Sequence, residues 1–133
     1  MKHEELTHDI IGCAMKVHST LGPGFLESVY QKALSHELSK TGHKIECEKA
    51  ITVLYDNQVV GDFLADILVD EKIILEIKAN QSLVPANEAQ LVNYLTATGI
   101  DDGLLLNFGA MKLEFKRKFR TYKKENLGQN EQN

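Results

Sequence analysis

The spacing of apolar residues changes period at Lys44, and this change limits the chain to folds that mix helices and strands. Before Lys44, apolar residues recur every three or four positions over residues 6–21 and 26–40, which predicts two helices. After Lys44 they alternate or run together, as in strands. The later segments predict strands over 45–55, 59–69 and 72–79, a helix over 85–98, and strands over 103–108 and 111–119. The order α-α-β-β-β-α-β-β indicates an α/β fold, a mixed sheet flanked by helices.

Glycine, proline and turn residues place the element ends. Gly22-Pro23-Gly24 ends the first helix, and Pro85 and Gly99 bound the third. Tight turns are expected at 55–58 and 70–71. The strands over 59–69 and 72–79 have near-continuous apolar stretches, as expected for central strands covered on both faces. Gly61 is a candidate β-bulge in the first of them.

Length and composition predict one domain over residues 1–122, followed by a polar, flexible tail over 123–133. A chain of 133 residues can bury a core without disulfides. It contains no run of about 18 apolar residues, and its start lacks the apolar region of a signal peptide, so we expect a cytoplasmic protein without a membrane span. Cys13 and Cys47 are expected to be reduced thiols in or near the core.

The charge distribution leaves two interpretations open. The net charge is −4, yet seven basic residues lie between positions 112 and 124, against the single acid Glu114. They could contact the phosphates of a nucleic acid, or they could form a solvated strand face that continues into a charged tail. The basic residues are Lys112, Lys116, Arg117, Lys118, Arg120, Lys123 and Lys124.

Two acids stand among apolar neighbours in adjacent predicted strands. Asp66 lies in Phe63–Val69, and Glu76 follows Ile73-Ile74-Leu75. A tight turn near residue 71 would place both carboxylates opposite each other on one face, with Lys78 on the same face. Buried carboxylates need a partner. The set could be an internal ion-pair network without chemistry, or it could hold a divalent cation for a phosphodiesterase, with the Ile77 carbonyl as a third ligand.

Other polar residues could complete such a site. Gln90 and Tyr94 are four positions apart on one helix face, where they could fix Lys78 or touch a phosphate. Glu27 lies in the first turn of the second helix, and its spacing alone favours a simple interaction with the helix dipole. His18 is expected to be packed and hydrogen-bonded. The other histidines, at positions 3, 8, 36 and 43, show no metal-binding spacing and are expected at the surface.

These motifs together resemble a known family over about residues 5–120. The segment Gly24-Phe25-Leu26-Glu27-Ser28-Val29-Tyr30 matches the GxxExxY pattern, and Asp66 with Glu76-Ile77-Lys78 matches the core signature of the PD-(D/E)XK nuclease superfamily. Gln90-Leu91-Val92-Asn93-Tyr94 matches the QxxxY element of some branches. The resemblance implies a restriction-endonuclease-like α-β-β-β-α-β core behind an extra N-terminal helix.

The resemblance also implies roles for the site residues. It makes Lys78 the catalytic lysine and Glu27 the helix acid that completes the site. We therefore expect a Mg²⁺- or Mn²⁺-dependent nuclease acting on DNA, favoured over RNA, with a homodimer as one way to hold a duplex. The alternative is a catalytically silent module that binds nucleic acid or protein on the same fold. The expected catalytic residues are Glu27, Asp66, Glu76, Lys78 and Gln90, the metal ligands Asp66, Glu76, Ile77 and Glu27, and the substrate contacts Tyr94, Tyr30 and Lys116.

Overall fold

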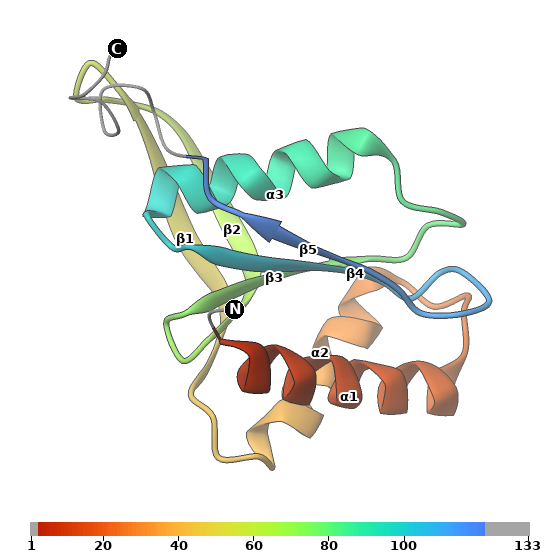
Figure 1. The fold of residues 1–133 in the computed structure, drawn as a ribbon. Helices are drawn as coiled ribbons and strands as arrows, with labels where there is room; N and C mark the ends of the chain where they lie inside the picture. Colours follow the sequence, from red (N-terminus) through yellow and green to blue (C-terminus); the bar gives the residue numbers. More distant parts are fainter. Residues whose placement is uncertain (1–2, 122–133) are drawn as a thin grey trace.

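The computed structural model describes residues 3–121, and its elements follow the predicted order (Figure 1). The basic residues Lys123 and Lys124 and the tail expected over 123–133 lie outside the described residues. The helices are α1 (Glu4–Leu21), α2 (Glu27–Ser39) and α3 (Pro85–Thr98). The strands are β1 (Ile45–Tyr55), β2 (Gln58–Val69), β3 (Ile73–Lys78), β4 (Asp102–Asn107) and β5 (Glu114–Phe119).

The five strands form one mixed sheet in the order β1-β2-β3-β4-β5. Strands β3 and β4 are parallel and are joined through α3, while the other neighbouring pairs are antiparallel. The hairpins β1–β2 and β2–β3 turn where two successive residues have positive φ, at Asp56-Asn57 and at Asp70-Glu71. Positive φ at both central residues is the signature of the type I′ turn, which suits the twist of paired strands. The turns are therefore where the sequence predicts them.

The sheet separates two apolar cores (Figure 1). Helices α1 and α2 cover one face, where Ile10, Leu34 and Phe108 are fully buried. Helix α3 covers the other face, where Leu91 and Leu95 pack on the sheet. This three-layer arrangement gives β3 and β4 cover on both faces, which accounts for their continuous apolar sequence.

The expectation that the whole 59–69 strand is covered on both faces is wrong. Only its end is buried, from Ala65 onward, apart from the half-buried Asp66. The remainder belongs to the distal hairpin, defined as residues 52–64, which projects past α3 (Figure 1). Its apolar side chains are largely exposed, although Phe63 lies against Tyr94 of α3 with ring centroids 5.2 Å apart. The pairing register shifts between Val53 and Leu54, close to the predicted bulge at Gly61.

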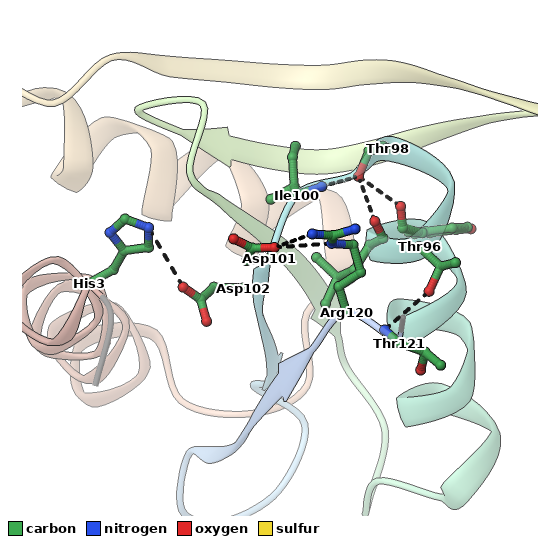
Figure 2. Close-up of polar contacts among 10 residues, drawn as sticks. His3, Thr96, Thr98, Ile100, Asp101, Asp102, Arg120 and Thr121 are labelled. Atoms are coloured by element: carbon green, nitrogen blue, oxygen red, sulfur yellow. Dashed lines mark hydrogen bonds and ion pairs between the residues drawn. The ribbon is translucent and has the colours of Figure 1, made fainter. Parts of the chain in front are cut away.

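Polar contacts hold the start of β4, at the end of the sheet opposite Lys78 (Figure 2). Arg120 donates from Nε and Nη2 to Asp101 Oδ1 at 3.0 and 2.8 Å. His3 Nε2 lies 3.7 Å from Oδ2 of the buried Asp102, which joins the start of α1 to the same strand end. These contacts lie at the end of the sheet away from Lys78, so they fix the start of β4 without involving the end of β3.

Cysteines and histidines largely follow the predictions. Both cysteines are free, with Cys13 half-buried as expected, but Cys47 is exposed and lies 3.0 Å from Ser35 Oγ, so it is not a core residue. His18 is packed and hydrogen-bonded through Nε2 to a backbone carbonyl 2.9 Å away. His43 is half-buried rather than fully at the surface, and its Nδ1 lies 2.7 Å from Asp70 Oδ2. No helix within residues 3–121 is long and apolar enough to cross a membrane.

Candidate active site

Asp66 and Glu76 lie where the pairing between β2 and β3 ends. The last paired residues are Ile67 and Leu75. Beyond them, the Asp66 N–H donates to Glu76 Oε2 at 3.0 Å, and the Ile77 N–H donates to Asp66 Oδ2 at 2.7 Å. Side-chain carboxylates thus take the place of backbone carbonyls as acceptors. The turn at Asp70-Glu71 brings the two acids together, as the spacing predicts.

The backbone of β1 is strained opposite Asp66. Glu48 has φ 53°, a left-handed conformation that costs a non-glycine residue about 1–2 kcal/mol. The β1–β2 pairing continues on both sides of Glu48 and Asp66 but omits these two residues. The strand pleat also changes phase here: Ile67 packs toward α1 and α2, whereas Ala65 packs toward α3. Strain held by its surroundings is typical of functional sites.

Glu76 resists ionisation in this environment. Its side chain is only 5% exposed, and this burial raises the pKa of Glu76 to about 7. The nearby charge of Asp66 adds to the rise, while the hydrogen bond from the Asp66 N–H and the charge of Lys78 oppose it. The Glu76 carboxyl therefore holds its proton close to neutrality unless a cation compensates the negative charge.

Asp66 is shifted in the same direction. Burial is the largest cause that raises the pKa of Asp66, and the charges of Glu27 and Glu48 raise it further. The hydrogen bond from the Ile77 N–H and the charge of Lys78 act against them. Four acids therefore share one region of negative potential, which favours binding of a cation.

Lys78, Gln90 and Tyr94 border the two carboxylates. Lys78 Nζ lies 3.5 Å from Gln90 Oε1, which links the end of β3 to α3. Tyr94 is nearly buried, and its ring centroid lies 5.2 Å from that of Phe63. Burial raises the pKa of Tyr94, and the charges of Glu76 and Asp66 raise it further, so the phenol lies within electrostatic reach of both acids. The residues predicted from the spacing on α3 thus face the strand pair.

Asn107 holds the loop that follows Lys78. Its fully buried amide accepts a hydrogen bond from the Asn80 N–H and donates one to the Asn80 carbonyl, both at 2.9 Å. It also donates to Glu114 Oε1 at 2.8 Å and accepts from the Gly109 N–H at 3.1 Å. The Oδ1 and Nδ2 atoms of Asn107 therefore each take part in two hydrogen bonds. This network ties the loop after β3 to β4 and β5.

Glu27 is the first residue of α2, and its exposed side chain faces the site closely enough to raise the pKa of both strand acids. Gln31, four residues later and so on the same helix face, donates from Nε2 to the Asp66 carbonyl at 2.9 Å. Sequence reasoning missed Gln31, although its spacing from Glu27 was an available signal. It also missed Glu48, for which sequence offers no signal because the strain depends on strand pairing.

Tyr30 is a packing residue, which corrects its expected role as a substrate contact. Its side chain is fully buried and stacks on Phe108 with ring centroids 4.8 Å apart. Its hydroxyl donates to the Gly22 carbonyl and accepts from the Phe25 N–H at 3.1 Å. No face of the ring is left for a substrate. Tyr30 instead fixes the loop before α2, where Gly24 has φ 114°, a value that favours glycine.

Lys116 lies on the edge strand β5, which β4 separates from the strand of Glu76. Its Nζ is 3.9 Å from Glu88 Oε2, and Lys118 Nζ is 3.0 Å from Glu88 Oε1. Other basic residues of this segment also pair with acids, such as Arg120 with Asp101. This pairing favours an ion-paired strand face over a phosphate-binding surface for the described part of the basic segment.

A divalent cation fits the donors at this position. Among the described residues, no group of three or more histidine, cysteine, aspartate or glutamate side chains is arranged to hold a metal ion. Mg²⁺, however, is usually bound by one or two carboxylates with water and substrate. Asp66 and Glu76 each use one carboxylate oxygen toward the backbone, which leaves a second for coordination. The Ile77 N–H points to Asp66, and in an extended strand the carbonyl of the same residue points to the same side.

Comparisons with known proteins agree with this geometry. The family model of the PD-(D/E)XK nuclease superfamily matches residues 4–118. The crystal structure of SSO0001 is similar, with a TM-score of 0.60 and 17% sequence identity, over 93% of this chain and 62% of that one. The chain thus spans less than two thirds of the length of that protein, and the likeness supports the fold alone. No functionally curated sequence matches significantly.

Proposed function

Since the chain belongs to the PD-(D/E)XK nuclease superfamily, we propose that it hydrolyses phosphodiester bonds of nucleic acid, DNA in preference to RNA, with a bound Mg²⁺ or Mn²⁺ ion. One observation carries the proposal: Asp66 and Glu76 exchange contacts with each other's strands and sit beside Lys78. The charge of Asp66 raises the pKa of Glu76, whereas the partner in a plain ion pair would lower it, so the two acids form a poor structural pair. A bound cation would offset this repulsion.

The proposed roles follow from the contacts. Asp66, Glu76 and the Ile77 carbonyl would hold the ion, with Glu27 at the open side of the site. When bound, a divalent ion lowers the pKa of a coordinated water and stabilises charge on the phosphate oxygens. Lys78 would orient the attacking water and offset the phosphate charge, and Gln90 would hold the Lys78 ammonium. Water would then add to phosphorus and release a proton to solvent, while the bond to the leaving oxygen breaks and that oxygen takes up a proton from solvent.

We further propose that the chain is a GxxExxY protein within the superfamily. Each defining residue of this pattern has its own structural role. Gly24 has a positive φ, Glu27 faces the acid pair from the first turn of α2, and Tyr30 fixes the preceding loop. The pattern thus describes how one helix presents a carboxylate to the sheet.

A cleavage assay with site variants tests the function. Purified protein is incubated with single- and double-stranded DNA and RNA in Mg²⁺ or Mn²⁺, and we expect at least one substrate to be cut. Glu76→Gln and Lys78→Ala should lower the rate by at least about 100-fold, as is usual when one electrostatic stabiliser of a transition state is lost. Lys72→Ala, at the other end of the same hairpin, is the matched control and should cut normally. Equal rates for Lys78→Ala and Lys72→Ala would contradict the assignment.

A catalytically silent binding module is the second candidate, and the small size of the chain, 133 residues, with its net charge of −4 favours it. Calorimetric titration separates the two candidates. The nuclease should bind Mn²⁺ at millimolar concentration or below, and Asp66→Asn should weaken that binding. A folded protein that binds nucleic acid but neither binds the metal nor cuts would establish the module.

A further inference from the structure

A groove lies between the distal hairpin and α3 and opens beside the candidate active site. Its volume is about 810 Å³, within the range of roughly 300–1,000 Å³ that is usual for small-ligand sites. Strands β1 and β2 form one wall, and one face of α3 forms the other. The polar and aromatic residues that line it are Thr52, Phe63, Gln90, Asn93, Tyr94 and Thr96.

Two lining residues connect the groove to the catalytic groups. Gln90 lines the groove and lies within 3.5 Å of Lys78 Nζ. Tyr94 also lines it, and packs with Phe63 on one side while lying in reach of the acid pair on the other. A ligand in the groove would therefore extend from the position where Lys78 would meet a phosphate.

The side chains that line the groove suit a nucleobase better than the phosphate of a nucleic acid. No lining residue carries a charge, so the groove lacks the cationic side chains that neutralise phosphates. Phe63 is 40% exposed and presents a ring on which a flat aromatic group could stack. The side chains of Gln90, Asn93 and Thr52 offer both hydrogen-bond donors and acceptors. An aromatic face beside mixed donors and acceptors is the usual setting for a nucleobase that has left its helix.

We propose that this groove binds an unpaired base of the substrate strand, next to the phosphate to be cleaved. The inference rests on the proposed nuclease function and adds a substrate class to it: single-stranded nucleic acid, or a duplex with an unpaired nucleotide. A base inside a regular duplex is stacked and paired on its neighbours, so it cannot also lie between the distal hairpin and α3.

Binding by variants of Phe63 tests the proposal. Affinity for a fluorescently labelled 12-nucleotide single-stranded DNA is measured by anisotropy in the Glu76→Gln background, where cleavage should be at least about 100-fold slower. Loss of one stacked base costs about 1–3 kcal/mol, so Phe63→Ala should weaken binding about 5- to 150-fold. Phe63→Leu keeps apolar bulk without a ring and should weaken it similarly. Leu64→Ala is the matched control: Leu64 is the next residue, 57% exposed, and lies outside the groove lining.

Abasic oligonucleotides show whether the ring acts on a base. Each base of the 12-mer is removed in turn, and removal at one position should weaken binding by the Glu76→Gln protein. The same removal should have no effect on the Phe63→Ala variant, because the stacking contact is already lost. Equal affinities of the Phe63 and Leu64 variants for every oligonucleotide would overturn the proposal.

Three outcomes distinguish the base site from the nuclease proposal and from a groove that is filled by a second copy of this chain. If the protein cleaves with metal but Phe63→Ala does not change its affinity for DNA, the base site is wrong and the nuclease proposal stands. If Phe63→Ala weakens DNA binding but no substrate is cleaved, the base site stands and the nuclease proposal is wrong. Sedimentation tests a second copy of this chain as the occupant: a dimer that Phe63→Ala breaks and Leu64→Ala preserves would overturn the base assignment.

Discussion

At the scale of single residues, Glu76 connects the chemistry of the site to protein stability. An acid whose pKa is higher in the folded state than in the unfolded chain binds protons more tightly when folded. Its contribution to stability is therefore full below about pH 4.5, the ordinary value, and is lost as pH rises through about 7. Asp66 is shifted in the same direction, so both acids make the metal-free protein less stable in neutral solution than in mildly acidic solution.

We expect Glu76→Gln to be more stable than the wild type above pH 7 without metal, by a few kcal/mol. The amide keeps an acceptor for the Asp66 N–H but carries no charge, so the gap should close as pH falls toward 4.5. Urea denaturation at several pH values in EDTA measures this difference in the free energy of unfolding. Saturating Mn²⁺ should reverse the order at pH 8, since it stabilises only a protein that binds it. A constant gap across pH would contradict the raised pKa.

Glu48 offers a second prediction at this scale. Its φ of 53° is easy for glycine and costly for glutamate, so Glu48→Gly should recover about 1 kcal/mol of strain. Glu48→Gln keeps the strain and is the control for loss of the charge. Thermal unfolding at pH 5, where the nearby acids are more protonated, separates the two contributions. If Glu48→Gly and Glu48→Gln unfold at the same temperature, the backbone carries no such strain.

At the scale of elements, the loop between β3 and α3 depends on one amide. Asn107→Ala would remove the hydrogen bonds between the buried Asn107 amide and the N–H and carbonyl of Asn80, each worth about 0.5–1.5 kcal/mol. Asn80→Ala changes an exposed side chain and keeps the backbone groups, so we expect it to be nearly neutral. Chemical denaturation of both variants tests this. A similar small loss for both would show that the Asn107 network does not hold the loop.

The elements also show how far sequence predicts this fold. Helix α3 begins and ends where Pro85 and Gly99 place it, because both residues act through local backbone geometry. The pairing of Asp66 with Glu76 followed from a local turn. The exposure of the distal hairpin cannot be predicted from its own sequence, because burial of a strand depends on helices that are distant in sequence. Tyr30 was misassigned for a similar reason: its partner Phe108 comes from another part of the chain.

At the scale of the whole molecule, stability is unevenly distributed. Strands β3 and β4 contribute to both cores, whereas the distal hairpin has largely exposed side chains and packs on α3 through Phe63 and Tyr94. Isolated two-stranded hairpins are marginally stable. The distal hairpin should therefore open locally without unfolding of the two cores.

Hydrogen exchange followed by mass spectrometry should show this division. We expect amides in the distal hairpin, residues 52–64, to exchange much faster than those in β3 and β4, which should exchange only through global unfolding. The proximal parts of the same strands, at Ile45–Cys47 and Ile67–Val69, serve as the internal control and should be protected. Binding of single-stranded DNA should slow exchange in the distal hairpin. Uniform protection along β1 and β2 would contradict the division.

The short turn at Asp70-Glu71 has a consequence for the order in which the chain folds. It lets Asp66 and Glu76 meet by a local closure, and hairpins of this kind form in about 1–10 μs. The parallel pairing of β3 with β4 requires the α3 crossover and comes later, since distant contacts carry a larger entropy cost. The two acids therefore approach each other while water still surrounds them. Their mutual repulsion acts at the first step of assembly, and their burial at the last.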